Sequence, residues 1–87
     1  MKREDVYKLI DGERAYQDGL GTDRVEDNRQ RRTVCEELVL LQVYVQRAME
    51  IWVDTPGDSE AEGMMRKIAG IAVRCMENHD APGRKKG

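Results

Sequence analysis

Residues 33–53 constrain the fold of this chain more than any other feature. Of these 21 residues, 14 are apolar, which is too long an apolar stretch for a single strand and predicts a helix. One face of that helix carries apolar side chains at three- and four-residue spacing: Leu38, Leu41, Val45, Ala48 and Trp52. Leu40, Tyr44 and Ile51 lie well off this face, so the helix is apolar around most of its circumference.

Such a helix must be buried on nearly all sides. The chain has 87 residues, and area scaling indicates that a monomer of this size buries only roughly 64% of its unfolded surface. This core is too thin to enclose the helix. The sequence therefore predicts that the chain assembles into a helical homo-oligomer.

Local signals set the boundaries of the second and third helices. Thr33 with Glu36, and Ser59 with Glu62, have the spacing of capping boxes. Residues 54–58 contain Pro and Gly and predict a turn, so the two helices are expected to form a long antiparallel hairpin. The third helix is expected to run to about Asn78. Its predicted inner face comprises Ala61, Met64, Met65, Ile68, Ala72, Cys75 and Met76.

The rest of the chain completes an all-α prediction of three helices. Val6, Leu9, Ile10 and Tyr16 predict a first helix over roughly 3–18, ended by Gly19-Leu20-Gly21. Residues 19–32 have almost no apolar pattern and are expected to form an exposed loop that can include a short helical turn. We expect one domain over 1–80 and a flexible basic tail over 81–87. In the third helix, the small residues Ala69, Gly70 and Ala72 would let another backbone come close.

Composition excludes several classes of protein. No apolar run approaches the length of a membrane span, and the charged start is not that of a signal peptide. Cys35 and Cys75 lie 40 residues apart without a CxxC motif, which favours two buried free thiols in a reducing, cytoplasmic setting. The net charge is −2 and no folded segment is strongly basic, so neither a membrane nor nucleic acid is an expected partner.

The acidic residues favour a structural role over metal binding. Glu36 and Glu37 open the second predicted helix, and Glu60 and Glu62 open the third. In an antiparallel hairpin these pairs lie at opposite poles, whereas Mg²⁺ needs converging carboxylates. Acids in a first helical turn also complement the helix dipole. We therefore predict no metal site, no cofactor and no catalytic residue, with His79 at a helix end treated as structural.

The basic residues of the two long helices are the candidate ligand anchors. Guanidinium and ammonium groups beside a close-packed interface suit a phosphate, and aromatic rings can stack on a base. The candidate ligand-binding residues are Arg47, Arg66, Lys67, Arg74, Tyr44 and Trp52. The alternative is ion pairing of the same cations with glutamates such as Glu50, Glu62 or Glu77. The basic run Arg29, Arg31 and Arg32 has no interleaved aromatic residue and favours a solvated loop.

Two stretches resemble a known family. Residues 12–18, GERAYQD, resemble the first helix of small MazG-like proteins, which are all-α nucleoside-triphosphate pyrophosphohydrolases with short versions in bacteriophages. Residues 65–82, MRKIAGIAVRCMENHDAP, are similar to the closing helix of those short versions. The resemblance spans about residues 12–82 and implies an all-α scaffold encoded by a phage and acting in the host cytoplasm.

The acidic motifs of active relatives are incomplete here. Those relatives carry EExxE on one helix and ExxD on the next, and these carboxylates hold Mg²⁺ against the triphosphate. In this chain Leu40 stands at the third acid position after Glu36-Glu37, and Gly63 and Met65 follow Glu60 and Glu62. Metal-assisted phosphoryl chemistry fails without the carboxylates that hold the ions. The resemblance thus implies a scaffold without the hydrolase activity.

Three functions follow as hypotheses. The first is a non-catalytic MazG-like protein that binds or sequesters a nucleotide-like phosphorylated small molecule at an oligomer interface. The second is a helical adaptor or inhibitor that binds a host protein through the apolar second helix. The third is an active pyrophosphohydrolase, for which Mg²⁺ would be required and Glu36, Glu37, Glu60 and Glu62 would act across subunits.

Overall fold

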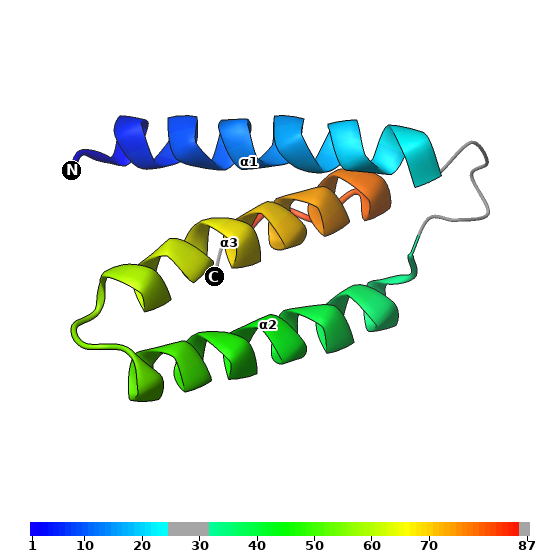
Figure 1. Cartoon of the computed structure of the whole chain (residues 1–87). Coiled ribbons are helices and arrows are strands. Elements are labelled where there is room, and N and C mark those ends of the chain that lie inside the picture. The colour runs from blue at the N-terminus through cyan, green and yellow to red at the C-terminus, as the bar shows by residue number, and fades with distance from the viewer. Residues whose placement is uncertain (25–31, 86–87) are drawn as a thin grey trace.

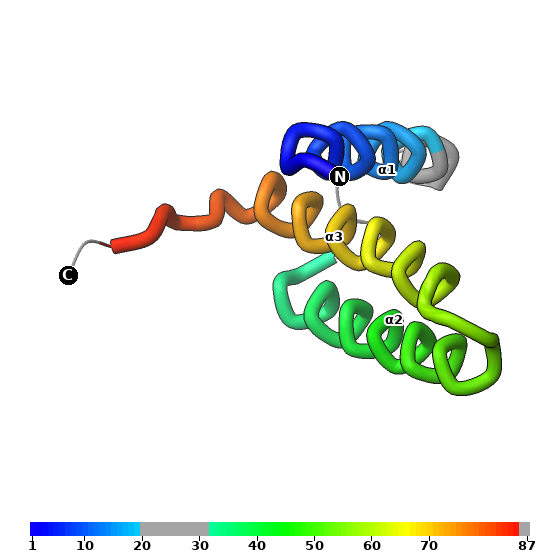
Figure 2. Tube along the Cα trace, turned by 90° about the vertical axis from the view of Figure 1, so that its left-hand side faces the viewer, coloured from blue at the N-terminus to red at the C-terminus, as the bar shows by residue number. Residues whose placement is uncertain are grey.

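The structure is a computed structural model that describes residues 1–24 and 32–85, with side chains described for 1–19 and 32–85. Within these residues there are three helices and no strand: α1 (Arg3–Arg24), α2 (Val34–Asp54) and α3 (Ser59–His79). The all-α prediction is confirmed. Residues 81–85 follow α3 without regular secondary structure and lead away from the helices (Figure 2).

The three helices form a single open layer with α3 in the middle. Both Figure 1 and Figure 2 show α3 between α1 and α2, and α3 is the helix that packs against each of the other two. The Cα atoms of the whole chain, the segment after α3 included, extend over 41 × 39 × 23 Å, and their radius of gyration is 14.6 Å. A compact domain of this length has a radius of about 12 Å. The chain by itself is therefore more open than a closed helical bundle.

The start of α2 agrees with its sequence signal. The backbone N–H of Glu36 donates to Thr33 Oγ1 at 3.1 Å, and the backbone N–H of Thr33 donates to Glu36 Oε1 at 2.8 Å. This reciprocal pair satisfies two backbone donors at the helix end and confirms the first capping box.

The second predicted capping box is wrong. Ser59 is the first helical residue of α3, and the cap position belongs to Asp58, whose side chain makes no capping hydrogen bond. The carboxylate of Asp58 instead accepts a hydrogen bond from Trp52 Nε1 at 2.7 Å. Gly57, with φ of 82°, provides the left-handed turn that brings the chain into α3 one residue earlier than the Ser59 signal suggests.

The first helix is longer than predicted. It continues through Gly19 and Gly21 to Arg24, so the expected loop over 19–32 is wrong for its first six residues. Glycine costs about 1 kcal/mol relative to alanine in a helix, which weakens a helix without forbidding it. The remainder of that loop, 25–31, with Arg29 and Arg31, lies outside the described residues.

Apolar burial is slight in the part of the chain that the structure describes. Ile71 of α3, 2% exposed, is the one buried large hydrophobic residue there. On the predicted inner face of α3, Met65 and Met76 are exposed, so that prediction is wrong for both. Both cysteines are free, as predicted, but Cys35 is exposed, not buried. The buried polar residues are Glu13, Arg14 and Glu37.

Candidate functional site

An ionic network joins α1 to α3. Arg14 Nε and Nη2 donate to Glu77 Oε1 and Oε2, each at 3.1 Å, while Nη2 also donates to Asp18 at 2.9 Å and Nη1 donates to Gln17 at 3.2 Å. The hydrogen bonds from Arg14 lower the pKa of Glu77, and those to Glu77 raise the pKa of Arg14. This bidentate pair holds the guanidinium group in one orientation and neutralises its charge.

A second ionic contact lies farther along the same interface. Buried Glu13 of α1 accepts hydrogen bonds from Arg66 Nε of α3 at 3.1 Å and from Gln17 Nε2 at 3.3 Å. The backbone of Gly70 lies directly beneath these side chains. A Cβ at Gly70 would stand 2.7 Å from Glu13 Cγ and 2.8 Å from Gln17 Nε2. The close approach therefore depends on glycine at this position.

The contact between α2 and α3 contains the most buried ion pair. Glu37 Oε2 and Oε1 accept from Arg74 Nε and Nη2 at 2.8 and 2.7 Å. The Glu37 side chain is 2% exposed and that of Arg74 is 21% exposed. Because both carboxylate oxygens are satisfied, the desolvated charge of Glu37 is tolerated. Sequence reasoning assigned Glu37 a helix-dipole role, whereas its side chain turns inward to Arg74.

Of the six predicted ligand-binding residues, three lie at separate positions and the other three lie together. Arg66 pairs with Glu13 towards α1, and Arg74 pairs with Glu37 towards the start of α2. Trp52 donates to Asp58 at the turn between α2 and α3. Trp52 is eight residues beyond Tyr44, or about 12 Å along the helix axis. These three therefore do not share one site with the remaining three.

The remaining three residues lie together. The guanidinium carbon of Arg47 is 5.0 Å from the centroid of the Tyr44 ring, and Nζ of Lys67 is 5.2 Å from the same centroid. Arg47 and Tyr44 come from α2 and Lys67 from α3. We call these three residues the cationic cluster. Within the described residues, neither cation has a carboxylate at salt-bridge distance.

The cationic cluster suits an anion better than a base. Tyr44 is half-buried, and a cation over such a ring gains about 0.5–2 kcal/mol, which holds each cation near the ring. A base stacked on Tyr44 would have to displace them. An anion, in contrast, would pair with the positive groups directly. Stacking by Tyr44 is thus the less favoured part of the predicted site.

The acidic residues do not gather into a metal site in the described part of the chain. No group of three or more His, Cys, Asp or Glu side chains there could hold a metal ion. Glu36 is engaged in the capping box, where the backbone N–H of Thr33 lowers its pKa. Glu60 and Glu62 are exposed in the first turn of α3. His79 Nε2 lies 3.0 Å from the carbonyl oxygen of Arg32.

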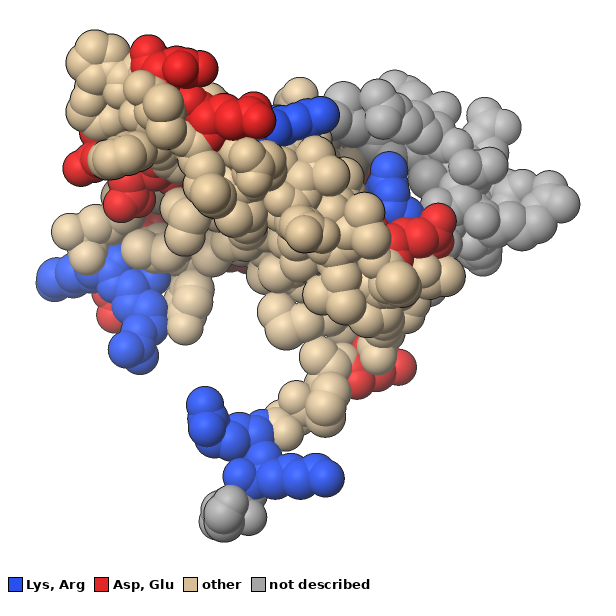
Figure 3. Space-filling model, turned by 90° about the horizontal axis from the view of Figure 1, so that it is seen from below, with Lys and Arg blue, Asp and Glu red and all other residues tan. Residues whose placement is uncertain are grey.

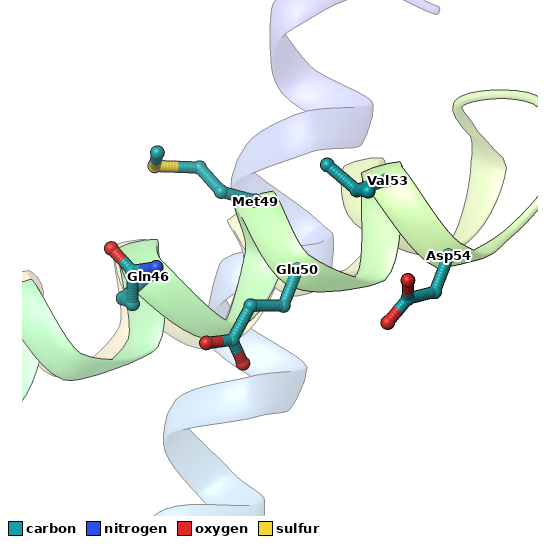
Figure 4. Close-up of a pocket in the computed structure, with 5 residues that line it drawn as sticks. All are labelled: Gln46, Met49, Glu50, Val53 and Asp54. Carbon is teal, nitrogen blue, oxygen red and sulfur yellow. The ribbon is translucent and has the colours of Figure 1, made fainter.

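A shallow depression runs along the outer surface of α2. It is lined by Gln46, Met49, Glu50, Val53 and Asp54, and Figure 4 shows that these side chains all project from this one helix. A depression on one helix cannot enclose a small molecule in the way that a pocket between elements does. It contains none of the six predicted ligand-binding residues.

The interhelical ion pairs are the feature that sequence reasoning missed. Glu50, Glu62 and Glu77 were considered as partners for the candidate cations, but Arg66 pairs with Glu13 and Arg74 pairs with Glu37. Glycine and small residues around Gly70 provided the one usable signal, since they predicted a close approach at that point. The structure brings Glu13 and Gln17 of α1 to this position.

Comparisons with known proteins give no relative for this chain. No family model, no curated protein and no solved structure matches it. Among the described helices, none combines the length and the apolar character that crossing a membrane requires.

Proposed function

We propose that this chain is a non-catalytic helical protein that assembles with copies of itself and binds an anionic, phosphorylated small molecule through Arg47 and Lys67. One observation carries the ligand-binding part of the proposal. Arg14, Arg66 and Arg74 are each neutralised by a carboxylate, whereas Arg47 and Lys67 share a tyrosine ring without a carboxylate partner in the described residues. Two uncompensated cations from adjacent helices form a site for added negative charge.

We propose that the scaffold of this chain derives from short MazG-like phage proteins, which its sequence resembles. In support, Glu13, Arg14 and Gln17 of the resembling stretch 12–18 all contact α3 or its side chains. These residues hold α1 and α3 together. This structural role does not require the carboxylates of a metal motif. Phage origin, a cytoplasmic location and an antiparallel α2–α3 hairpin as the unit of assembly belong to this proposal.

Catalysis is not part of the proposal because two of the four candidate acids are already engaged. Glu36 accepts a hydrogen bond at the start of α2, and Glu37 is buried against Arg74. We expect pyrophosphate release from nucleoside triphosphates with Mg²⁺ to stay at background. Turnover that is lost in a Glu37→Gln variant would contradict a non-catalytic role.

Binding of a phosphorylated probe tests the cationic cluster. We expect ATP and inorganic triphosphate to bind the wild-type chain in isothermal titration calorimetry, and adenosine not to bind. Lys67→Ala and Arg47→Ala should each weaken triphosphate binding about tenfold, the effect of losing one charged hydrogen bond. Lys8→Ala is the matched control, since it removes the same charge from an exposed position on α1. Equal affinity in Lys67→Ala and Lys8→Ala would overturn this assignment.

A second candidate function is a helical adaptor that binds a host protein. It is favoured by the large apolar side chains that α2 exposes, among them Leu38 and Val45. A wild-type chain that stays monomeric and keeps these side chains in water would support this function over self-assembly.

A further inference from the structure

One face of α2 carries a regular row of exposed apolar side chains. Leu38, Val45 and Trp52 are 59%, 44% and 57% exposed and follow one another at seven-residue spacing. Val34 and Met49 are also exposed and lie on the same side of the helix by its periodicity. We call these five residues the apolar stripe. A seven-residue apolar repeat is typical of a helix that packs lengthwise against another helix.

The charges of α2 lie away from Leu38, Val45 and Trp52, the row at the centre of the apolar stripe. By helical periodicity Glu36, Arg47, Glu50 and Asp54 fall on the other side of the helix. Glu37 is closer, but it is buried and neutralised by Arg74. Seen from the side of α2, Figure 3 shows a broad area without Lys, Arg, Asp or Glu across the middle of the molecule. The same surface on a second copy would therefore meet it without repulsion between like charges.

The chain exposes more surface than a compact monomer of its mass, by an amount typical of a stable interface. The chain exposes 7272 Å², whereas a compact monomer of 10.0 kDa exposes about 5,200 Å². The difference is about 2,000 Å², and a permanent homodimer buries about 1,000–2,500 Å² on each partner. The surface that the whole chain exposes in excess of a compact monomer is thus comparable with what one partner of a permanent homodimer buries.

We propose that a second copy of this chain covers the apolar stripe, with α2 packed against α2 in a two-fold contact centred near Val45. Val45 lies midway between Leu38 and Trp52, so a symmetric contact about it engages the whole row. A neutral, self-complementary face fits a symmetric dimer, in which the same surface is used twice. This inference rests on the self-assembly part of the proposed function and adds the surface that performs it.

The test compares one substitution at two positions of α2. Val45 and Val43 are 44% and 40% exposed, but only Val45 belongs to the apolar stripe. We expect Val45→Glu to reduce the mass in analytical ultracentrifugation at micromolar concentration to that of one chain, 10.0 kDa. Val43→Glu, the matched control, should leave the dimer intact. A buried glutamate without a partner explains the difference.

The single tryptophan gives a second readout that needs no variant. Trp52 belongs to the apolar stripe and is the one tryptophan of the chain. Dilution of the wild-type chain should shift its fluorescence to longer wavelength over the same concentration range in which the mass halves. This measurement decides the matter if Val45→Glu loses its helical circular dichroism.

The outcomes separate this inference from the proposed function. If the Val45→Glu variant is still a dimer, or if the emission wavelength of Trp52 does not change as the dimer dissociates, the α2 contact is wrong. The chain would still assemble with itself, but through another surface. A wild-type chain that is monomeric at every concentration overturns both. Failure of triphosphate to bind overturns the ligand-binding proposal and leaves the α2 contact untouched.

Discussion

Glu37 illustrates how a single residue can couple two helices. The residue is 1% exposed, and its carboxylate oxygens lie within 2.8 Å of two nitrogen atoms of Arg74. The pair is well satisfied, so its net contribution to stability is small compared with the cost of breaking it. This asymmetry gives a sharp expectation for paired substitutions.

We expect Arg74→Met to destabilise the fold by about 3–5 kcal/mol because Glu37 is left buried and unpaired. The double variant Glu37→Leu with Arg74→Met should recover most of this loss, since neither side chain then carries a charge. Urea unfolding of the two single variants and the double variant measures the coupling. Additive effects in that cycle would show that the pair acts as two independent residues.

The glycines of α3 differ in what surrounds them. A Cβ added at Gly70 would have two α1 side chains within 3 Å, whereas a Cβ added at Gly63 would meet nothing within 4 Å. Gly63→Ala should therefore raise the free energy of unfolding by about 0.5–1 kcal/mol through helix propensity. Gly70→Ala should lower it by about 1–3 kcal/mol because α1 is displaced. Thermal unfolding of both variants checks this; stabilisation of both would mean that α1 does not approach Gly70.

At the scale of the elements, ion pairs between side chains help to attach both α1 and α2 to α3, and those of α1 are the more numerous in the described residues. The hydrogen bonds between the α1 and α3 side chains come from two arginines and two glutamates: Arg14, Arg66, Glu13 and Glu77. Several of the apolar residues of α1 face water, including Val6, Leu9 and Tyr16. The attachment of α1 therefore includes an ion pair, Arg14–Glu77, that protonation of Glu77 would break.

The pH dependence of the α1 attachment follows from the lowered pKa of Glu77. A carboxylate whose pKa is lower in the folded chain contributes stability above its unfolded pKa and loses it as the pH falls through its folded value. We expect unfolding in urea to become easier between pH 7 and about pH 3. Glu77→Gln should show a smaller change over this range, because the titrating partner of Arg14 is absent. An unchanged pH profile in Glu77→Gln would contradict this attribution.

At the scale of the whole molecule, the sequence predicts what depends on neighbours along the chain. The α2 start at Thr33 and Glu36, the turn before α3 and the all-α class all follow from short-range signals. The contacts between helices do not. Glu13 is 53 residues from Arg66, and Arg14 is 63 residues from Glu77, and nothing in the local pattern links these partners.

The candidate site was predictable only in part for the same reason. Basic residues of α2 and α3 could be identified as candidates from the sequence. Which of them have a carboxylate partner depends on the side chains that the fold brings near them. Arg66 and Arg74 acquire partners from other helices, and Arg47 and Lys67 do not within the described residues. That difference is a property of the packed helices, not of either segment.

The flat shape of the molecule also bears on which substitutions it can accept. In a layer 23 Å thick with α3 at its centre, most side chains have solvent on at least one side. A larger side chain can then swing outwards, so sequence change is tolerated over most of the surface that the chain presents alone. Intolerance should concentrate along the middle of α3, where Gly70 and Ile71 are enclosed. A library of single substitutions selected for folding should therefore retain the least variety at these two positions.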